Sequence, residues 1–364
     1  MKKAVSVAIL VLLPLAAYLS LAPVPIEPVR WTAPKPPAME ANTRLSALHT
    51  IDLHGGVGPE HIALGPDGSI YTGLESGDIL RMNADGSGQK VLASTGGRPL
   101  GMEVDGQGGV VVADAYKGLL FVTPDGTVMV LADKVDGDPI RLADGVSVAR
   151  NGKIYFSDAS RRFAPQHETG TMFAAQLDLL EQSATGRILE YDPATRATRV
   201  VARGISFANG VILSGDEKWL YFNETGRYRV WKVDVNAVNL DIAQPSPQAR
   251  VVLDNLPGFP DNLTRGQGGK LWLGLAGPRN QLDDMAQYPF LRKLILRLPK
   301  ILWPPIKTYG HVIAFTEDGK ILADLQDPSG ASGTTTGVTE SPDRLYIQSI
   351  DSHRIGWLPA AKEN

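Results

Sequence analysis

Carboxylate and amide side chains recur at one position of a segment that the chain repeats six times. The repeated segments read PEHIAL, PLGMEV, ADGVSV, ANGVIL, DNLTRG and TTGVTE, and their alignment brings into register Glu60, Leu100, Asp144, Asn209, Asn262 and Thr336. Asp261 stands beside Asn262. Such oxygens are ligands of hard cations, and Ca²⁺ takes about six to eight of them. We therefore predict a calcium site with the ligands Glu60, Asp144, Asn209, Asp261 and Asn262.

A turn is the alternative explanation of these side chains. Asn and Asp before Gly favour turns, and ADG or ANG alone would form a turn in most sequences. The same register in four separate segments favours the metal site. Without a cation, the carboxylates of Glu60, Asp144 and Asp261 would repel one another.

The six segments belong to a longer repeat. A turn precedes each of GSIYTG, GGVVVAD, GKIYFSD, KWLYFNE, GKLWLGL and DRLYIQS, which align on Tyr71, Val111, Tyr155, Tyr221, Trp272 and Tyr346. The intervals of 40, 44, 66, 51 and 74 residues contain a unit of about 40 residues with insertions, which is typical of a β-propeller blade. We predict an all-β fold: a six-bladed β-propeller over residues 45–364, with residues 45–53 as the outermost strand of the last blade.

Inner strands line the axis of a propeller, so the predicted ligands converge at one end of the central tunnel. We call this end the mouth. Helical insertions at 171–182 and 289–303 are predicted to cover it. The predicted substrate pocket comprises Tyr116, Lys117, Asp158, Glu224 and Thr336. Of the six histidines, His353 and His61 fall nearest the mouth, although an isolated loop histidine is more often a surface or packing residue than a base.

Composition excludes several classes of site and partner. The 364 residues contain no cysteine, which excludes disulfides, Cys-based zinc sites and thiol nucleophiles. The net charge of −3 provides no basic surface for a phosphate backbone, so no nucleic-acid partner is expected. The chain has no GxSxG motif, which leaves serine-triad hydrolysis without support. The oligomeric state and the physiological substrate stay open.

The N-terminal residues form a separate segment. Lys2 and Lys3 precede an uncharged run from Ala4 to Ala22 that as a helix approaches the thickness of the hydrocarbon core of a bilayer. Residues 1–22 are predicted to be a transmembrane signal anchor; a cleaved signal peptide and a buried helix are the alternatives. The lysine pair predicts an exported body, periplasmic in a bacterium, or secreted after cleavage.

Two further segments bear on the membrane. Six prolines between residues 23 and 37 predict an extended, semi-rigid spacer, within a linker of residues 23–44, that holds the folded part off the bilayer. The predicted helix at 289–303 mixes Arg and Lys with Leu, Ile, Phe and Trp and is broken at Pro299. We expect it to be a lid, a membrane-surface element or both, with a cover for a blade edge as the plainer alternative.

The sequence GRPLGMEV, followed by VVVADAYKGL, GRILEYD, FANGV, PGFPDN, the apolar helix and RLYIQS, resembles the strictosidine synthase-like family, which includes adipocyte plasma membrane-associated proteins. Paraoxonases and SMP-30/gluconolactonases are in the same superfamily of six-bladed propellers. The resemblance covers residues 45–360 and includes the membrane anchor of several members. It implies calcium ligands at Glu60, Asn209, Asp261 and Asn262; Asp144 stands where relatives usually have Asn. Paraoxonases also have a disulfide, which this chain cannot form.

The resemblance implies a calcium-dependent hydrolase of small lactones or aryl esters, in which the cation polarises the carbonyl. Gluconolactonase-like relatives imply Asp261 as the base that activates water, with His353 second. Strictosidine synthase has a catalytic Glu where this chain has Thr336, so condensation of an amine with an aldehyde is not expected. A non-catalytic binding or scaffold protein is the alternative from another class, since a fold does not fix a function.

Overall fold

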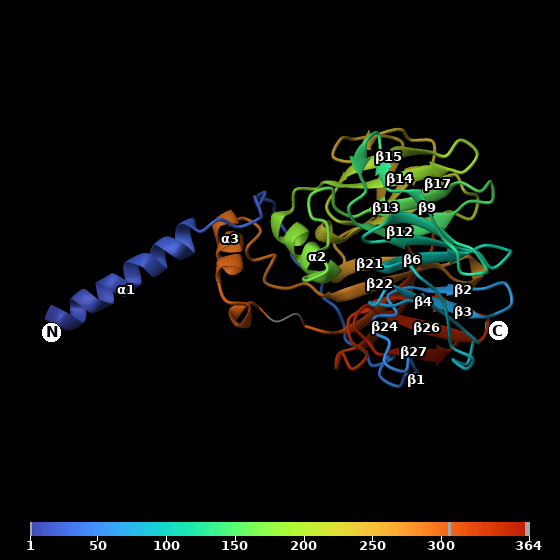
Figure 1. The fold of residues 1–364 in the computed structure, drawn as a ribbon, viewed down its shortest axis with the longest axis horizontal. Coiled ribbons are helices and arrows are strands. Elements are labelled where there is room, and N and C mark those ends of the chain that lie inside the picture. The colour runs from blue at the N-terminus through green and yellow to red at the C-terminus, as the bar shows by residue number, and fades with distance from the viewer. Residues whose placement is uncertain (1, 305–306, 361–364) are drawn as a thin grey trace.

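The computed structural model describes residues 2–304 and 307–360, with side chains from residue 12 onward. Six antiparallel sheets form a ring of blades, and three helices lie to one side of it (Figure 1). The inner strands of successive blades contact one another in chain order, and that of the last blade returns to that of the first. The predicted all-β six-bladed propeller is confirmed.

Each blade is built on a sheet of four strands, which in blades 1 to 5 run outward from the axis in chain order. Blade 1 contains β2 (Ile62–Leu64), β3 (Ile70–Gly73), β4 (Asp78–Met82) and β5 (Lys90–Ser94). Blade 2 contains β6 (Pro99–Val104), β7 (Val110–Asp114), β8 (Gly118–Val122) and β9 (Val128–Ala132). Blade 3 contains β12 (Ala143–Val148), β13 (Ile154–Asp158), β14 (Gly186–Asp192) and β15 (Ala197–Ile205), with β19 (Leu240–Asp241) added in parallel to β15.

The other three blades follow the same plan. Blade 4 contains β16 (Ala208–Leu213), β17 (Trp219–Glu224), β18 (Arg229–Asp234) and β20 (Ala249–Leu253). Blade 5 contains β21 (Gly258–Arg265), β22 (Leu271–Pro278), β23 (Gly310–Phe315) and β24 (Ile321–Asp327). Blade 6 contains β25 (Thr335–Glu340), β26 (Arg344–Ser349), β27 (Arg354–Pro359) and β1 (His49–Asp52). A small hairpin of β10 (Lys134–Val135) and β11 (Asp138–Pro139) and two short helices, η1 (Thr225–Arg227) and η2 (Gln267–Gly269), lie between strands.

The N-terminal strand closes the ring. β1 pairs antiparallel with β27, with Ile51 opposite Ile355. Both side chains are buried against blade 1, so the first strand of the propeller completes its last blade. This confirms the prediction for residues 45–53, and it covers a sheet edge that would otherwise be free to pair.

The apolar core is divided among the interfaces between blades. Tyr155 and Phe222, for example, lie in the cluster between blades 3 and 4, and Tyr71 and Val112 lie in that between blades 1 and 2. Strands buried on both faces explain the almost continuously apolar second strands of the repeat. The axis itself is lined by polar side chains of the inner strands, which leaves room there for a site.

Two helices cover the mouth, as predicted. They are α2 (Gly170–Glu181) and α3 (Pro289–Arg297), the latter followed by η3 (Lys300–Leu302). Proline fits the first turn of a helix, and the residue before a proline disfavours helical backbone, so Pro289 and Pro299 set the two ends of α3. Figure 1 shows α2 and α3 together on the side of the ring from which α1 (Lys2–Leu21) extends. We call α2, α3 and η3 the lid.

Residues 22–36 form an extended strap across the lid. The N–H of Val29 donates to the carbonyl of Glu181 over 2.8 Å, and the N–H of Trp31 donates to that of Ala286 over 3.3 Å. Ile26 is fully buried in a cluster with residues of α2 and of blades 2 to 4. The segment is extended, as its prolines predict, but it is not the expected spacer, because it is bound along the body of the protein.

No helix in the part of the chain that the structure describes is both long and apolar enough to cross a membrane. Met1 and the side chains of residues 2–11, which contribute to the predicted anchor, lie outside that part.

Candidate metal centre and pocket

The first residues of the inner strands carry the candidate ligands, and a bulge aims them at the axis. The pairing of the inner with the second strand is irregular at this point in blades 2 to 6, for example between Ala143 and Val146 in β12 and between Ala208 and Val211 in β16. A bulge redirects a side chain without ending the strand. Asp144 and Asn209 lie within these two bulges.

The glycines after the ligands allow the inner strands to approach closely. A Cβ atom on Gly145 would lie 2.9 Å from the Cα of Gly210, and one on Gly210 would lie 2.5 Å from the carbonyl oxygen of Asp261. Neither glycine has a positive φ. ADG and ANG are thus parts of tightly packed strands, and the alternative that they are turns is wrong.

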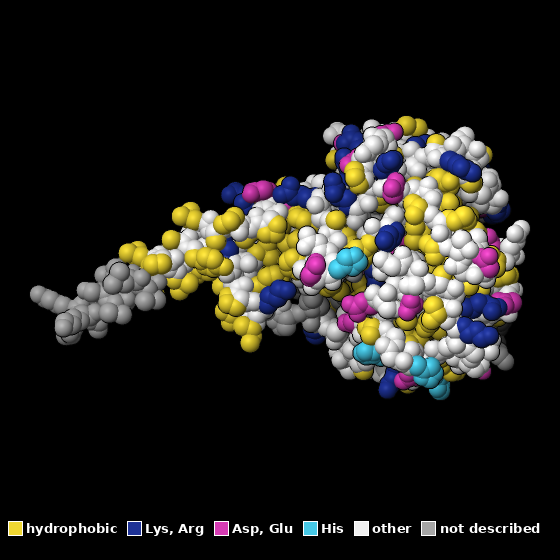
Figure 2. All heavy atoms as spheres, viewed as in Figure 1, with side chains coloured by type: hydrophobic (Ala, Val, Ile, Leu, Met, Phe, Trp, Pro, Cys, Tyr) yellow, Lys and Arg dark blue, Asp and Glu magenta, His cyan; other side chains and the backbone are white. Residues whose placement is uncertain are grey.

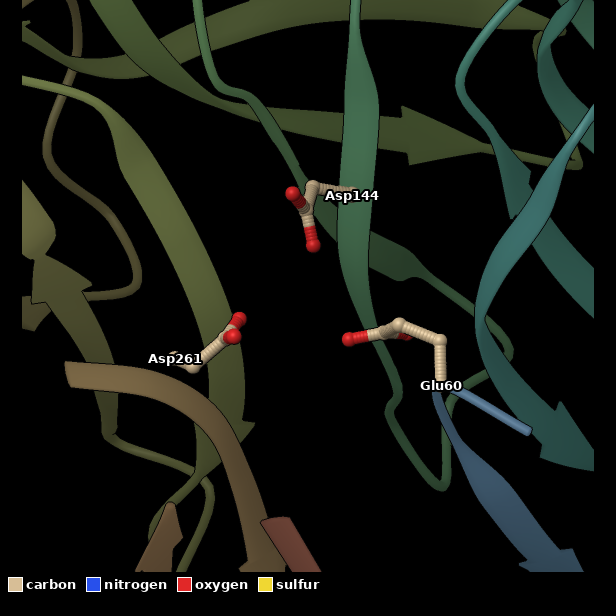
Figure 3. Close-up of side chains that lie close together, drawn as sticks. All are labelled: Glu60, Asp144 and Asp261. Atoms are coloured by element: carbon tan, nitrogen blue, oxygen red, sulfur yellow. The ribbon is translucent and has the colours of Figure 1, made fainter. Parts of the chain in front are cut away.

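Three carboxylates from three blades point toward one another at the mouth (Figure 3). They belong to Glu60, Asp144 and Asp261, and one oxygen of each lies within 4.8 Å of the others. Their side chains are almost completely buried, with residue exposures of 2%, 5% and 8%. The sequence prediction that these residues converge is confirmed by this geometry.

Several oxygens at the centre lack a hydrogen-bond donor. Oε2 of Glu60, Oδ1 of Asp144 and Oδ1 of Asn209 are buried and accept no hydrogen bond from any residue that the structure describes. A buried polar atom without a partner costs about 1–3 kcal/mol. Together with Asp261, these residues offer oxygen ligands and no thiolate or imidazole, which fits a hard divalent cation.

Burial and mutual repulsion oppose ionisation of the three carboxylates. Burial raises the pKa of Glu60 to about 7, against the opposing charge of Arg98. Burial and then the charge of Glu60 raise the pKa of Asp144 well above its usual range. The pKa of Asp261 is raised by burial and by both neighbouring carboxylates. A cation among them would offset both effects and hold all three ionised.

Asn262 lies behind the centre instead of in it. Its Nδ2 donates to Oε1 of Glu60 over 2.7 Å and to the carbonyl oxygen of Glu60 over 2.9 Å. The hydroxyl of Thr336 donates to the same carbonyl over 2.6 Å. The structure therefore gives Asn262 and Thr336 a different position from the predicted ones of ligand and pocket residue: both hold Glu60 in place.

An apolar pocket of about 200 Å³ extends from the carboxylates to the lid. Glu60, Asp144, Asn209 and Asp261 form its polar end. Most of the remaining wall is apolar and comes from the lid and from the loops beneath it, including Leu100, Leu142, Met172, Leu179, Phe207, Phe259, Met285, Ile295 and Trp303. The lid covers part of this pocket. The long intervals of the repeat predicted such insertions, but not which of their side chains would line the pocket.

The predicted pocket residues lie elsewhere. Among the residues described, neither Tyr116, Lys117, Asp158, Glu224 nor Thr336 lines the pocket. The Tyr116 ring stacks on His167 with centroids 4.8 Å apart, outside the pocket, and Lys117 is exposed.

The two buried acids among them have structural partners. Asp158 accepts the N–H groups of residues 141 and 142, each over 3.1 Å, and pairs with Arg187 over 2.9 Å. Glu224 accepts the N–H of Ser206 over 3.1 Å. Each acid ends a second strand and fixes the segment that leads into the neighbouring inner strand, so these side chains position the centre instead of facing it.

The same arrangement recurs in blades 2 and 6. Asp114 accepts the N–H of Arg98 over 3.1 Å, and Asp351 accepts the N–H of Thr334 over 2.8 Å. The sequence signal for this role was an acid after each of the strands VVVAD, IYFSD, WLYFNE and IQSID.

No histidine in the described chain lines the pocket. The side chain of His353 is exposed in the loop before β27, and the structure does not bring it to the carboxylates. His61 is half-buried and faces a second cavity of about 620 Å³ at the other end of the tunnel. Burial lowers its pKa to about 4.

Comparisons with known proteins agree on one family by sequence. The profile described as strictosidine synthase matches residues 144–237, and that described as strictosidine synthase-like, N-terminal, matches residues 37–82. The chain is 36% identical to the strictosidine synthase-like 6 protein of Arabidopsis thaliana over 300 residues, which are 80% of this chain and 76% of the relative. It is 31% identical to the adipocyte plasma membrane-associated protein of Salmo salar over 382 residues, 96% of this chain and 88% of the relative.

Solved structures show the fold alone. A gluconolactonase from Xanthomonas campestris superposes with a TM-score of 0.60 at 19% identity, covering 92% of this chain and 98% of its own. Regucalcin from Agrobacterium tumefaciens, described as a calcium-binding protein, superposes with a TM-score of 0.58 at 16% identity. The superposition covers 86% of this chain and 93% of the regucalcin chain.

Proposed function

The chain belongs to the strictosidine synthase-like family, and from the geometry of its buried centre we propose that it is a metal-dependent hydrolase of uncharged lactones or aryl esters. The observation that carries the proposal is the position of the three carboxylates and Asn209 at the closed polar end of an apolar pocket. An apolar pocket with a few convergent polar groups is the usual form of a small-molecule site.

We propose that Ca²⁺ is the cation, held by Glu60, Asp144, Asn209 and Asp261. All four side chains offer oxygen ligands. Three of these oxygens accept no hydrogen bond, which supports a cation as their partner. When bound, the cation would polarise the carbonyl of the substrate and stabilise negative charge on its oxygen. Regucalcin, a calcium-binding protein, has the same fold.

Asp261 is the proposed general base. It lines the pocket, and the side-chain amide of Asn223 donates to its backbone carbonyl, which fixes the strand that carries it. Its carboxylate would accept a proton from a water molecule while the oxygen of that water molecule forms a bond to the acyl carbon. The bond from the acyl carbon to the alkoxy oxygen then breaks, and the leaving oxygen takes the proton, giving acid and alcohol. We give His353 no role here, because it does not line the pocket.

The apolar wall favours substrates without charge. Leu142, Phe207 and Phe259 contribute apolar surface beside the carboxylates, and burying an unpaired charge among them would be costly. The carboxylates at the end of the pocket are buried, and burial strengthens electrostatic interactions with a substrate there. A gluconolactonase shares the fold, which fits a lactone as substrate.

A panel of aryl acetates and of lactones with alkyl chains of increasing length tests the proposal. We expect the full chain to hydrolyse members of the panel, and Asp261→Asn to lower kcat/KM by about 10²-fold or more, the usual contribution of a positioned base. Glu103→Gln is the matched control, since Glu103 lines the opposite cavity. No turnover of any member would favour the alternative, a non-catalytic binding protein.

We also propose that the propeller is attached to a membrane on its exported side. The uncharged run from Ala4 to Ala22 behind two lysines supports this. One relative is named an adipocyte plasma membrane-associated protein. Protease digestion of intact spheroplasts, in which an exported body would be cut, tests the orientation.

A further inference from the structure

Large apolar side chains are exposed on one end of the molecule. On α1 they are Leu12, Leu13, Leu15, Tyr18 and Leu21, and on the outer side of the lid they are Tyr288, Phe290, Leu291, Ile301 and Leu302. Ile301 is 91% exposed and Leu21 is 79% exposed. Figure 2 shows apolar side chains gathered at this end, where α1 meets the lid. We call these ten residues the apolar end.

The two parts of the apolar end are held together. Arg297 of α3 donates from Nε to the carbonyl of Ala22 over 2.7 Å and from Nη1 to the carbonyl of Leu19 over 3.1 Å. Carbonyls at the C-terminal end of a helix have no partner within it, and a buried cation there is favourable. α1 is therefore capped by α3, and their exposed apolar side chains form one surface.

The segment that carries the outer side of the lid is basic. Residues 285–311 contain five Arg and Lys residues and no Asp or Glu. Arg292 and Arg297 are buried, which leaves Lys293, Lys300 and Lys307 near the surface. Lys293 pairs with Glu27 over 2.6 Å, and Lys300 lies over the ring of Phe173. Apolar side chains beside lysines suit the boundary between the acyl chains and the anionic headgroups of a bilayer.

We propose that the part of the apolar end on the lid lies on the surface of an anionic lipid bilayer, beside the attachment through α1, so that the outer side of the lid faces lipid. α1 projects from the body of the protein in Figure 1, and its large apolar side chains from Leu12 to Leu21 are exposed. A projecting helix with exposed apolar side chains favours a bilayer over a protein partner. The inner side of the same lid, through Leu179 and Ile295, lines the pocket. This contact goes beyond attachment through residues 4–22, which does not require the lid to touch lipid, and it does not depend on the proposed hydrolase activity.

Site-specific labels can test the contact, because the natural chain has no cysteine. Ile301→Cys and Phe290→Cys in the full chain would each carry an environment-sensitive fluorophore. Val238→Cys, at a position that is 72% exposed and outside the apolar end, is the control. The protein is added to vesicles of phosphatidylcholine with phosphatidylserine, with and without nitroxide-labelled lipid.

We expect brighter, blue-shifted emission that nitroxide lipid quenches at positions 301 and 290, but not at position 238. Replacing phosphatidylserine by phosphatidylcholine, or introducing Lys300→Glu, should reduce the quenching at position 290. The proposal would be overturned if the protein binds the vesicles but its labels at positions 301 and 290 stay as exposed to water as the label at position 238. A shift that depends on protein concentration without lipid would overturn it in favour of a second copy of the chain.

Discussion

The side-chain amide of Asn262 donates to Oε1 of Glu60 over 2.7 Å, although the two residues are 202 positions apart in the chain. Glu60 precedes the inner strand of blade 1, and Asn262 lies on the inner strand of blade 5. The hydrogen bond fixes one oxygen of the carboxylate, while Oε2 has no donor among the described residues. A carboxylate held this way presents its second oxygen to the centre.

Removing the donor should weaken cation binding without removing a ligand. Asn262→Ala is expected to lower the affinity for Ca²⁺ by about 10–100-fold, the usual effect of losing a partner that orients a ligand. Isothermal titration calorimetry measures the affinity for Ca²⁺. Asn236→Ala, which changes a residue in an exposed turn, is the control. An affinity equal to that of the wild type would show that Asn262 does not position the ligand.

Asp144→Asn should change stability and binding in opposite directions. In chelator at pH 8, the variant is expected to unfold at a higher temperature than the wild type, because one buried charge beside Glu60 and Asp261 is gone. Ca²⁺ should raise the melting temperature of the variant less than that of the wild type, since the variant has lost a charged ligand. Calorimetry with and without the cation measures both effects, and Asp216→Asn, at an exposed turn, is the control. A lower melting temperature in chelator would contradict the repulsion that we infer.

The strap should stabilise the lid. Ile26→Ala removes a fully buried side chain from the cluster beneath α2, and such a change costs about 2–5 kcal/mol. Hydrogen exchange followed by mass spectrometry should show faster exchange in residues 170–181. Val29→Ala, at a side chain that is 47% exposed, should leave that exchange unchanged. Equal exchange in the Ile26 variant and the wild type would mean that the strap does not hold the lid.

One buried carboxyl in the lid predicts a pH dependence of stability. Burial, with the charge of Glu181, raises the pKa of Asp178 to about 7. The folded state therefore keeps a proton that the unfolded state loses. The free energy of unfolding should fall by roughly 4 kcal/mol as pH rises from about 4 to 7, and it should level off at higher pH.

Asp178→Asn should remove this contribution. Urea unfolding at pH 5 and pH 8 should show a smaller difference for the variant than for the wild type. Asp125→Asn, in an exposed turn, should keep the difference seen in the wild type. A wild-type protein that is more stable at pH 8 than at pH 5, with the same trend in the Asp178 variant, would contradict the assignment.

Much of the propeller and the centre followed from periodicity. The repeat predicted the six blades, the closing strand and the convergence of Glu60, Asp144 and Asp261, because one residue of each inner strand faces the axis. Periodicity did not separate ligands from the residues that hold them. Asn262 shares the register of the ligands, and only the pairing across blades 1 and 5 shows that its amide faces Glu60.

The pocket and the strap could not be predicted in the same way. The pocket wall comes from insertions, and contacts such as that of Ile26 with residues of α2 join segments about 150 positions apart. The acids Asp158 and Glu224 were correctly placed after second strands, but whether an acid at a strand end faces a pocket or accepts backbone N–H groups depends on the loop beside it.

The dependence of hydrolysis on the cation tests the account most directly. The full chain is freed of metal with a chelator, the loss of metal is verified by elemental analysis, and the hydrolysis of a lactone is measured before and after Ca²⁺ is returned. We predict that activity falls to background and returns with Ca²⁺ in the wild type, and that Glu60→Gln recovers little of it. Hydrolysis at an unchanged rate by protein shown to be free of metal would contradict the account.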